Sequence, residues 1–114
     1  MATTFHLVPE EVWDAADRAA PYEAASLATE GFIHCTDGVE ALGQTFDRHY
    51  AADARPFLAL TVDLDALDIP WRYDVPGSPY PHLYGSIDRR AIVDVRTVAR
   101  HRDGRFRALE PARV

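Results

Sequence analysis

The stretch Phe57-Leu58-Ala59-Leu60-Thr61-Val62-Asp63-Leu64 decides the fold class, because it is a nearly continuous apolar run. Its length suits a buried strand, and alternate residues of a strand share one face. The bulkiest aliphatic side chains of the run all fall on the same face: Leu58, Leu60, Val62 and Leu64. The sequence therefore predicts a central strand here.

A strand and a helix are predicted before this run, over residues 5–21. Residues 5–8 (Phe-His-Leu-Val) form the strand. Pro9 suits a first helical position, because its missing N–H needs no partner there. One apolar stripe at helical spacing then leads to a helix end near Pro21: Val12, Ala15, Ala16 and Ala19.

A second strand and a second helix are predicted over residues 32–50. Residues 32–35 (Phe-Ile-His-Cys) follow a glycine and form the strand. Asp37 and Glu40 have the spacing of a capping box, with Asp in place of Ser or Thr. Apolar residues then repeat at helical spacing: Val39, Leu42, Phe46 and Tyr50.

Strands and turns dominate the rest of the chain. The expected order is a weaker strand (71–75), a proline-rich loop (76–81), a short extended segment (82–85), a β-branched strand (92–102), an Asp103-Gly104 hairpin turn and a last strand from Arg105. Two helices near the N-terminus followed by strands predict an α+β fold, with the helices packed on a largely antiparallel sheet.

Length and composition predict one domain over residues 1–114. Apolar residues make up 47% of the chain, enough for one core at this length. Cys35 is the single cysteine, so no disulfide can form within the chain. No apolar run approaches the roughly 20 residues that span a bilayer, and the N-terminus lacks the pattern of a secretory signal. We expect a cytoplasmic protein without membrane contact.

The charge is unevenly distributed. Residues 1–87 hold 4 arginines against 14 acidic residues, a charge of −10, whereas residues 88–114 hold 8 arginines against 4, a charge of +4. The overall charge of −6 argues against duplex DNA as a partner. The basic end is typical of a solvated face, although an RNA end or a protein partner stays open. Because the chain contains no lysine, a lysine Schiff base is excluded.

Histidines are the strongest candidates for a site. On a strand, His34 shares a face with Phe32 and Thr36, and His82 shares a face with Tyr84. Each pair would place an imidazole beside a hydroxyl. Imidazole exchanges protons near neutral pH and can donate a hydrogen bond to a ribose hydroxyl. The alternative is that each histidine is partly buried with its ring nitrogens satisfied by the protein.

A metal site is not expected. His34 and Cys35 are neighbours on a strand and point apart, and no Cys-x-x-Cys or His-x-x-x-His spacing occurs. The aspartates after the central strand lack the Gly and Glu of a calcium-binding loop and are interpreted as turn formers: Asp63, Asp65 and Asp68. Cys35 is interpreted as a buried structural thiol.

Several strings together resemble the bacterial domain-of-unknown-function 952 family. They are Phe5-His6-Leu7, Trp13, Ser26-Leu27, Gly31-Phe32-Ile33-His34-Cys35-Thr36 and Pro81-His82-Leu83-Tyr84-Gly85, and the match runs from about Thr4 to Val98. The resemblance implies an ADP-ribosyltransferase-like fold, in which small antiparallel sheets frame an NAD-binding cleft. The order of segments is also similar to that of the catalytic half of RNA 2′-phosphotransferases.

The resemblance also implies roles for individual residues. His34 and His82 would be catalytic, and His6, Thr36 and Tyr84 would contact NAD or another ADP-ribose-containing nucleotide. His82 and Tyr84 stand where many such transferases place a catalytic Glu, so an enzyme of this kind would be an ADP-ribosyl- or phosphotransferase-like one without the usual Glu.

Two other functions stay open. The first is a catalytically inactive interaction module, whose basic C-terminal region from Arg96 to Arg107 would form the partner surface. The second is a nucleotide-processing hydrolase unrelated to NAD.

Overall fold

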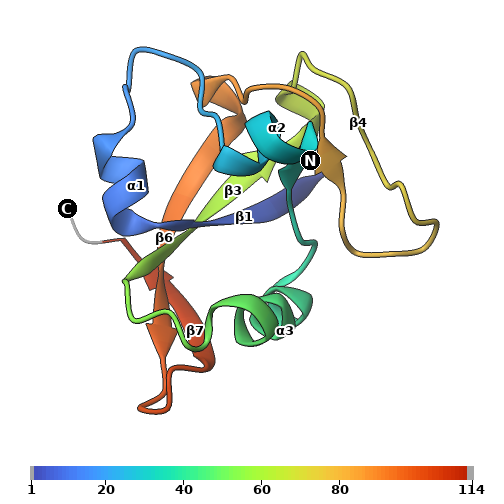
Figure 1. Cartoon of the computed structure of the whole chain (residues 1–114). Coiled ribbons are helices and arrows are strands. Elements are labelled where there is room, and N and C mark those ends of the chain that lie inside the picture. Colours follow the sequence, from blue (N-terminus) through green and yellow to red (C-terminus); the bar gives the residue numbers. More distant parts are fainter. Residues whose placement is uncertain (1, 113–114) are drawn as a thin grey trace.

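The computed structural model describes residues 2–112 and contains two antiparallel sheets (Figure 1). The four-stranded sheet has the order β1 (Thr3–Pro9), β3 (Phe57–Asp63), β6 (Ile92–Arg100) and β7 (Phe106–Pro111). The three-stranded sheet has the order β2 (Ile33–His34), β5 (His82–Leu83) and β4 (Trp71–Arg72). The predicted class, α+β with small antiparallel sheets, is confirmed.

The predicted central strand, β3, pairs with β1 on one side and β6 on the other. Leu60 and Val62 are fully buried in a core cluster that also contains residues of the smaller sheet. Phe57 and Ala59 are buried on the opposite face, in a second cluster with α3 (Val39–Tyr50). The run is almost continuously apolar because both of its faces are covered.

The first predicted helix is shorter than expected. α1 (Glu10–Ala15) ends at Ala15, because Ala16 is extended and no residue of α1 is buried. The chain instead crosses to Tyr22, whose backbone exchanges two hydrogen bonds of 2.8 Å with Ile87. Burial of Tyr22 in the core stabilises this path more than the alanine-rich stripe would stabilise a longer helix. The predicted helix end near Pro21 is therefore wrong.

A further short helix, α2 (Ala25–Glu30), was not predicted, so three helices precede β3 instead of two. Two single-turn 3-10 helices, η1 (Leu64–Ala66) and η2 (Arg89–Ala91), flank the later strands. The weaker strand predicted at 71–75 is paired only over Trp71 and Arg72. Asp63 accepts a hydrogen bond from the backbone N–H of Asp65, which confirms that it forms a turn.

α3 begins where predicted but without a capping box. Gly38, with a φ of 83°, occupies the N-cap position, and the carboxylate of Asp37 accepts a hydrogen bond from the hydroxyl of Tyr73 instead. Leu42, Gly43 and Phe46 form the buried face of the helix. α3 packs against β7 of the C-terminal hairpin (Figure 1).

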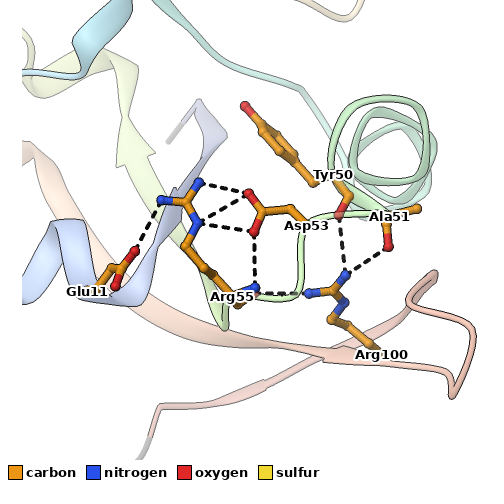
Figure 2. A network of polar contacts seen from close by, with 6 residues as sticks. All are labelled: Glu11, Tyr50, Ala51, Asp53, Arg55 and Arg100. Carbon is orange, nitrogen blue, oxygen red and sulfur yellow. Dashed lines mark hydrogen bonds and ion pairs between the residues drawn. The ribbon is translucent and has the colours of Figure 1, made fainter.

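The end of α3 is held by arginines (Figure 2). The guanidinium of Arg100 donates to the carbonyls of Tyr50 and Ala51 at 3.3 and 3.1 Å, and to that of Arg55 at 3.0 Å. Arg55 is paired in turn with Asp53 at 2.7 Å and Glu11 at 3.2 Å. A positive side chain therefore satisfies the carbonyls that a helix leaves free at its C-terminus.

We expect Arg100→Met to lower the free energy of unfolding by about 1.5–3 kcal/mol, because several carbonyls lose a charged donor. Urea unfolding followed by tryptophan fluorescence would measure the change. Arg102→Met is the control, since Arg102 is exposed on the same hairpin and should change stability by less than about 0.5 kcal/mol. Equal losses in the two variants would contradict the assigned role of Arg100.

Candidate functional site

Two of the predicted site residues face each other across paired strands. β2 and β5 are antiparallel, with His34 directly opposite His82, and the centres of the two rings are 5.5 Å apart. Ile33 and Leu83, also paired, are fully buried on the other face. A one-residue shift in register would expose these two side chains, so the core fixes the meeting of the two imidazoles.

Phe32 completes an aromatic cluster around the histidine pair. Its ring stacks on that of His82, with 4.0 Å between centres and 15° between planes. The same ring meets His34 edge-on at 4.8 Å. The expectation that Phe32 shares a face with His34 is confirmed, although Phe32 was not among the predicted site residues.

Each histidine of the pair contacts a carboxylate. Nε2 of His34 lies 3.0 Å from Oε2 of Glu30, and Nδ1 of His82 lies 2.7 Å from Oδ2 of Asp74. The hydroxyl of Tyr84 also donates to Oδ2 of Asp74, and Nε of Arg72 donates to Oδ1 at 2.6 Å. These hydrogen bonds, the one from Tyr84 first, hold the pKa of Asp74 far below its usual range.

His6 lies beneath the pair and is buried. Its Nδ1 is 2.7 Å from the carbonyl oxygen of His34, and its Nε2 is 3.0 Å from the hydroxyl of Tyr22. Burial lowers the pKa of His6 to about 4, so the ring is neutral at physiological pH. Because a carbonyl only accepts, Nδ1 carries the hydrogen and Nε2 accepts from Tyr22. Both ring nitrogens of His6 therefore form hydrogen bonds within the protein, and the one from Nδ1 holds the backbone carbonyl of His34.

One cavity brings the three histidines together. It has a volume of about 760 Å³, and His6, His34 and His82 all line it. Glu30 and Thr36 line the cavity beside them, and Arg48 of α3 lines it from another side. This volume lies within the range of about 300–1,000 Å³ that is typical of small-molecule sites. The fold therefore brings the three histidines, which lie far apart in the sequence, to one hollow.

The two predicted hydroxyl partners are placed differently. Thr36 is buried, lines the cavity, and has its hydroxyl 3.3 Å from that of Thr45. Tyr84 shares the carboxylate of Asp74 with His82. Its contact with a ligand stays a prediction, and its observed role is in holding Asp74. Cys35 is buried as predicted, and burial raises the pKa of its thiol.

Among residues 2–112, no group of three or more His, Cys, Asp or Glu side chains is arranged to hold a metal ion. Within the same residues, no helix has both the length and the apolar character that a membrane span requires.

Sequence reasoning missed Glu30, Asp74 and Phe32. Glu30 stands four residues before His34, but Gly31, with a φ of 87°, ends the helix between them. Helical spacing therefore could not predict the contact between Glu30 and His34. Asp74 lies in the irregular segment after β4, where the sequence does not predict which way its side chain points. Only Phe32 had a usable signal, its alternation with His34.

Fold and site together define a small α+β protein in which two antiparallel sheets present a histidine-lined cavity. The chain belongs to the family described as "Protein of unknown function (DUF952)", which matches residues 7–95.

Solved structures of protein CC0527 from Caulobacter crescentus have the same fold. Two crystal structures, one of them of a double mutant, are each 22% identical to this chain, with a TM-score of 0.74 over 93% of this chain and 94% of theirs. A solution NMR structure is 24% identical, with a TM-score of 0.70 over 92% of this chain and 91% of its own. A search of curated proteins gave no match.

Proposed function

We propose that the cavity binds NAD or a related ADP-ribose-containing nucleotide, and that His34 and His82 cleave it or transfer a group from it. The observation that carries the proposal is the meeting of three histidines, from three separate strands, around one cavity of about 760 Å³. The resemblance of the segment order to that of the catalytic half of RNA 2′-phosphotransferases is the reason for proposing this class of ligand.

The histidine pair has the geometry for proton transfer to and from a bound sugar. With ring centres 5.5 Å apart, one imidazole can take a proton from an attacking hydroxyl or water while the other hydrogen-bonds a neighbouring ligand oxygen. Glu30 lines the same cavity, and its carboxylate would stabilise positive charge on a sugar carbon as a glycosidic bond breaks. A carboxylate is therefore available although the usual Glu is replaced by His82.

The remaining predicted residues take supporting parts in this proposal. Thr36 would offer its hydroxyl to a ribose from the cavity wall. His6 would act through the carbonyl of His34, and Tyr84 through Asp74. Tyr80 also lines the cavity and would supply an aromatic face for a base.

The inactive interaction module has less support. Its expected partner surface, the basic region from Arg96 to Arg107, is largely engaged within the chain. Arg96 pairs with Asp94 at 2.9 Å, and Arg107 lies 3.4 Å from Glu110. The guanidinium of Arg100 donates to the carbonyl of Ala51 at the end of α3. Each of these arginines would have to exchange a contact within the chain for one with a partner.

Titration calorimetry with NAD and with ADP-ribose tests the proposal. We expect the wild-type protein to bind at least one of the two, and His34→Ala to weaken binding about 10-fold or more, a loss of at least about 1.4 kcal/mol. His101→Ala is the matched control, because His101 is exposed on the distant hairpin and should bind like wild type. An absence of heat from the wild-type protein, or equal affinities of wild type and His34→Ala, would refute the proposal.

A further inference from the structure

We propose that Asp74 is a positioning residue, which holds His82 so that its Nε2 accepts the proton in the reaction of the cavity. The inference rests on the proposed function and deepens it, because it distinguishes the parts played by the two histidines. It follows from three features: the donors around Asp74, the stacking of the His82 ring, and the difference in exposure between the two histidines.

Three side chains donate hydrogen bonds to the carboxylate of Asp74. His82 and Tyr84 share Oδ2, and Arg72 occupies Oδ1. The guanidinium of Arg72 also lies over the ring of Tyr84, 4.2 Å from its centre, which holds both donors in place. A carboxylate with three donors stays ionised at neutral pH, in agreement with the lowered pKa of Asp74.

An ionised carboxylate fixes the tautomer of its histidine partner. It can only accept, so the hydrogen between it and His82 belongs to Nδ1. In the neutral ring the lone pair is then on Nε2. Nε2 of His82 makes no hydrogen bond to any other part of residues 2–112, and His82 lines the cavity. The ring thus offers a proton acceptor to a ligand.

The ring of His82 is held at its face as well as at its edge. Phe32 stacks on it at 4.0 Å, so the imidazole cannot rotate without losing either this contact or the bond to Asp74. His34 is held less firmly, since its side chain is 54% exposed against 20% for His82, and its carboxylate partner is 52% exposed. The two histidines are therefore not equivalent, and His82 is the better-positioned base.

This arrangement allows His82 to take a proton from an attacking group. The proton of an attacking hydroxyl or water moves to Nε2 of His82, and the oxygen uses the electron pair of the broken O–H bond to form a bond to the sugar carbon. The glycosidic bond of that carbon breaks, and its electron pair leaves with the departing group. The imidazolium that forms is compensated by the negative charge of Asp74 at 2.7 Å. Asp74 touches no ligand in this scheme and acts through His82 alone.

Nitrogen-15 NMR of the histidine rings in the full chain, without ligand, tests the arrangement. At a pH where the ring is neutral, we expect His82 to be the Nδ1–H tautomer. Asp74→Asn should shift it toward the Nε2–H tautomer, because an amide can donate to Nδ1, and Asp74→Glu should restore the wild-type signal. Tyr84→Phe is the control: it removes a donor from the same oxygen and should leave the tautomer unchanged.

The inference is overturned if wild-type His82 carries its hydrogen on Nε2, or if Asp74→Asn leaves the wild-type tautomer in place. Calorimetry separates this result from a failure of the proposed function. A wild-type protein with the Nδ1–H tautomer that binds neither NAD nor ADP-ribose would refute the nucleotide proposal while the arrangement of Asp74 and His82 stands.

Discussion

Replacing Phe46 with alanine is expected to lower the free energy of unfolding by about 3–5 kcal/mol. Phe46 is the largest of the fully buried side chains of α3, and it lies in the core cluster shared with the four-stranded sheet. Its ring meets that of Phe57 edge-on at 5.3 Å and lies 6.3 Å from that of Phe106. Truncation would leave a cavity between helix and sheet that the strands cannot close.

Two matched variants on α3 make this prediction specific. Phe46→Leu retains most of the buried volume, so it should lower the free energy of unfolding by only about 1.5 kcal/mol, less than Phe46→Ala does. Val39→Ala changes an apolar residue that is 46% exposed and should change stability by less than about 0.5 kcal/mol. Urea unfolding would measure all three. A loss for Phe46→Ala no larger than that for Val39→Ala would show that α3 is not anchored through Phe46.

Stability should also fall by about 2–3 kcal/mol between pH 7 and pH 4.5 because of His6 alone. Its pKa is about 4 in the folded protein, against 6.5 for an ordinary histidine, because burial disfavours the charged ring. Between these two values the unfolded chain binds more protons than the folded one, so stability rises with pH across this window. Acidification therefore favours unfolding, and the effect is complete below about pH 4.

The acidic residues act in a different pH range. Hydrogen bonds from Arg55 lower the pKa of Asp53 to about 2, and Arg90 likewise lowers the pKa of Asp88. The stability that such carboxylates contribute is present above their unfolded pKa, near 3.8, and is lost as the pH falls further. These carboxylates therefore contribute little to the change in stability between pH 6.5 and pH 4.5.

His6→Asn isolates this effect. The Asn amide can still donate to the carbonyl of His34 but does not titrate, whereas Tyr22 loses its acceptor. We expect the variant to be less stable at pH 7 and to show a flatter dependence of unfolding free energy on pH. His101→Asn, at an exposed position, should retain the wild-type dependence. An unchanged slope in His6→Asn would mean that folding does not lower the pKa of His6.

The parts of the fold that local pattern decides were predictable. Residues 57–64 and the helix after Asp37 each have a pattern that their burial reproduces, and the chain turns at Asp103-Gly104 as predicted. The segment from Ala16 to Tyr22 was not predictable, because an alanine-rich stripe is a weak signal and its path is set by the distant partner Ile87. Local propensity yields there to a tertiary contact.

In the candidate site, too, only the features that depend on local pattern were predictable. Alternation along the strands placed His34 and Phe32 on one face and Ile33 and Cys35 on the other, as observed. The pairing of β2 with β5 joins residues 48 positions apart, so the approach of His82 to His34 depended on the family resemblance. The burial of His6 and the hold of Asp74 on His82 depend on neighbours that no local pattern identifies.

The bridge between Phe5 and Thr36 has a consequence for how copies of the chain meet. β1 is an edge strand, and two hydrogen bonds of 2.9 and 2.8 Å join Phe5 to Thr36 along its outer side. That side is thereby partly closed to strand addition by another molecule. The opposite edge, β7, ends in Pro111 and carries the charged side chains of Arg107 and Glu110, which also discourage edge-to-edge aggregation.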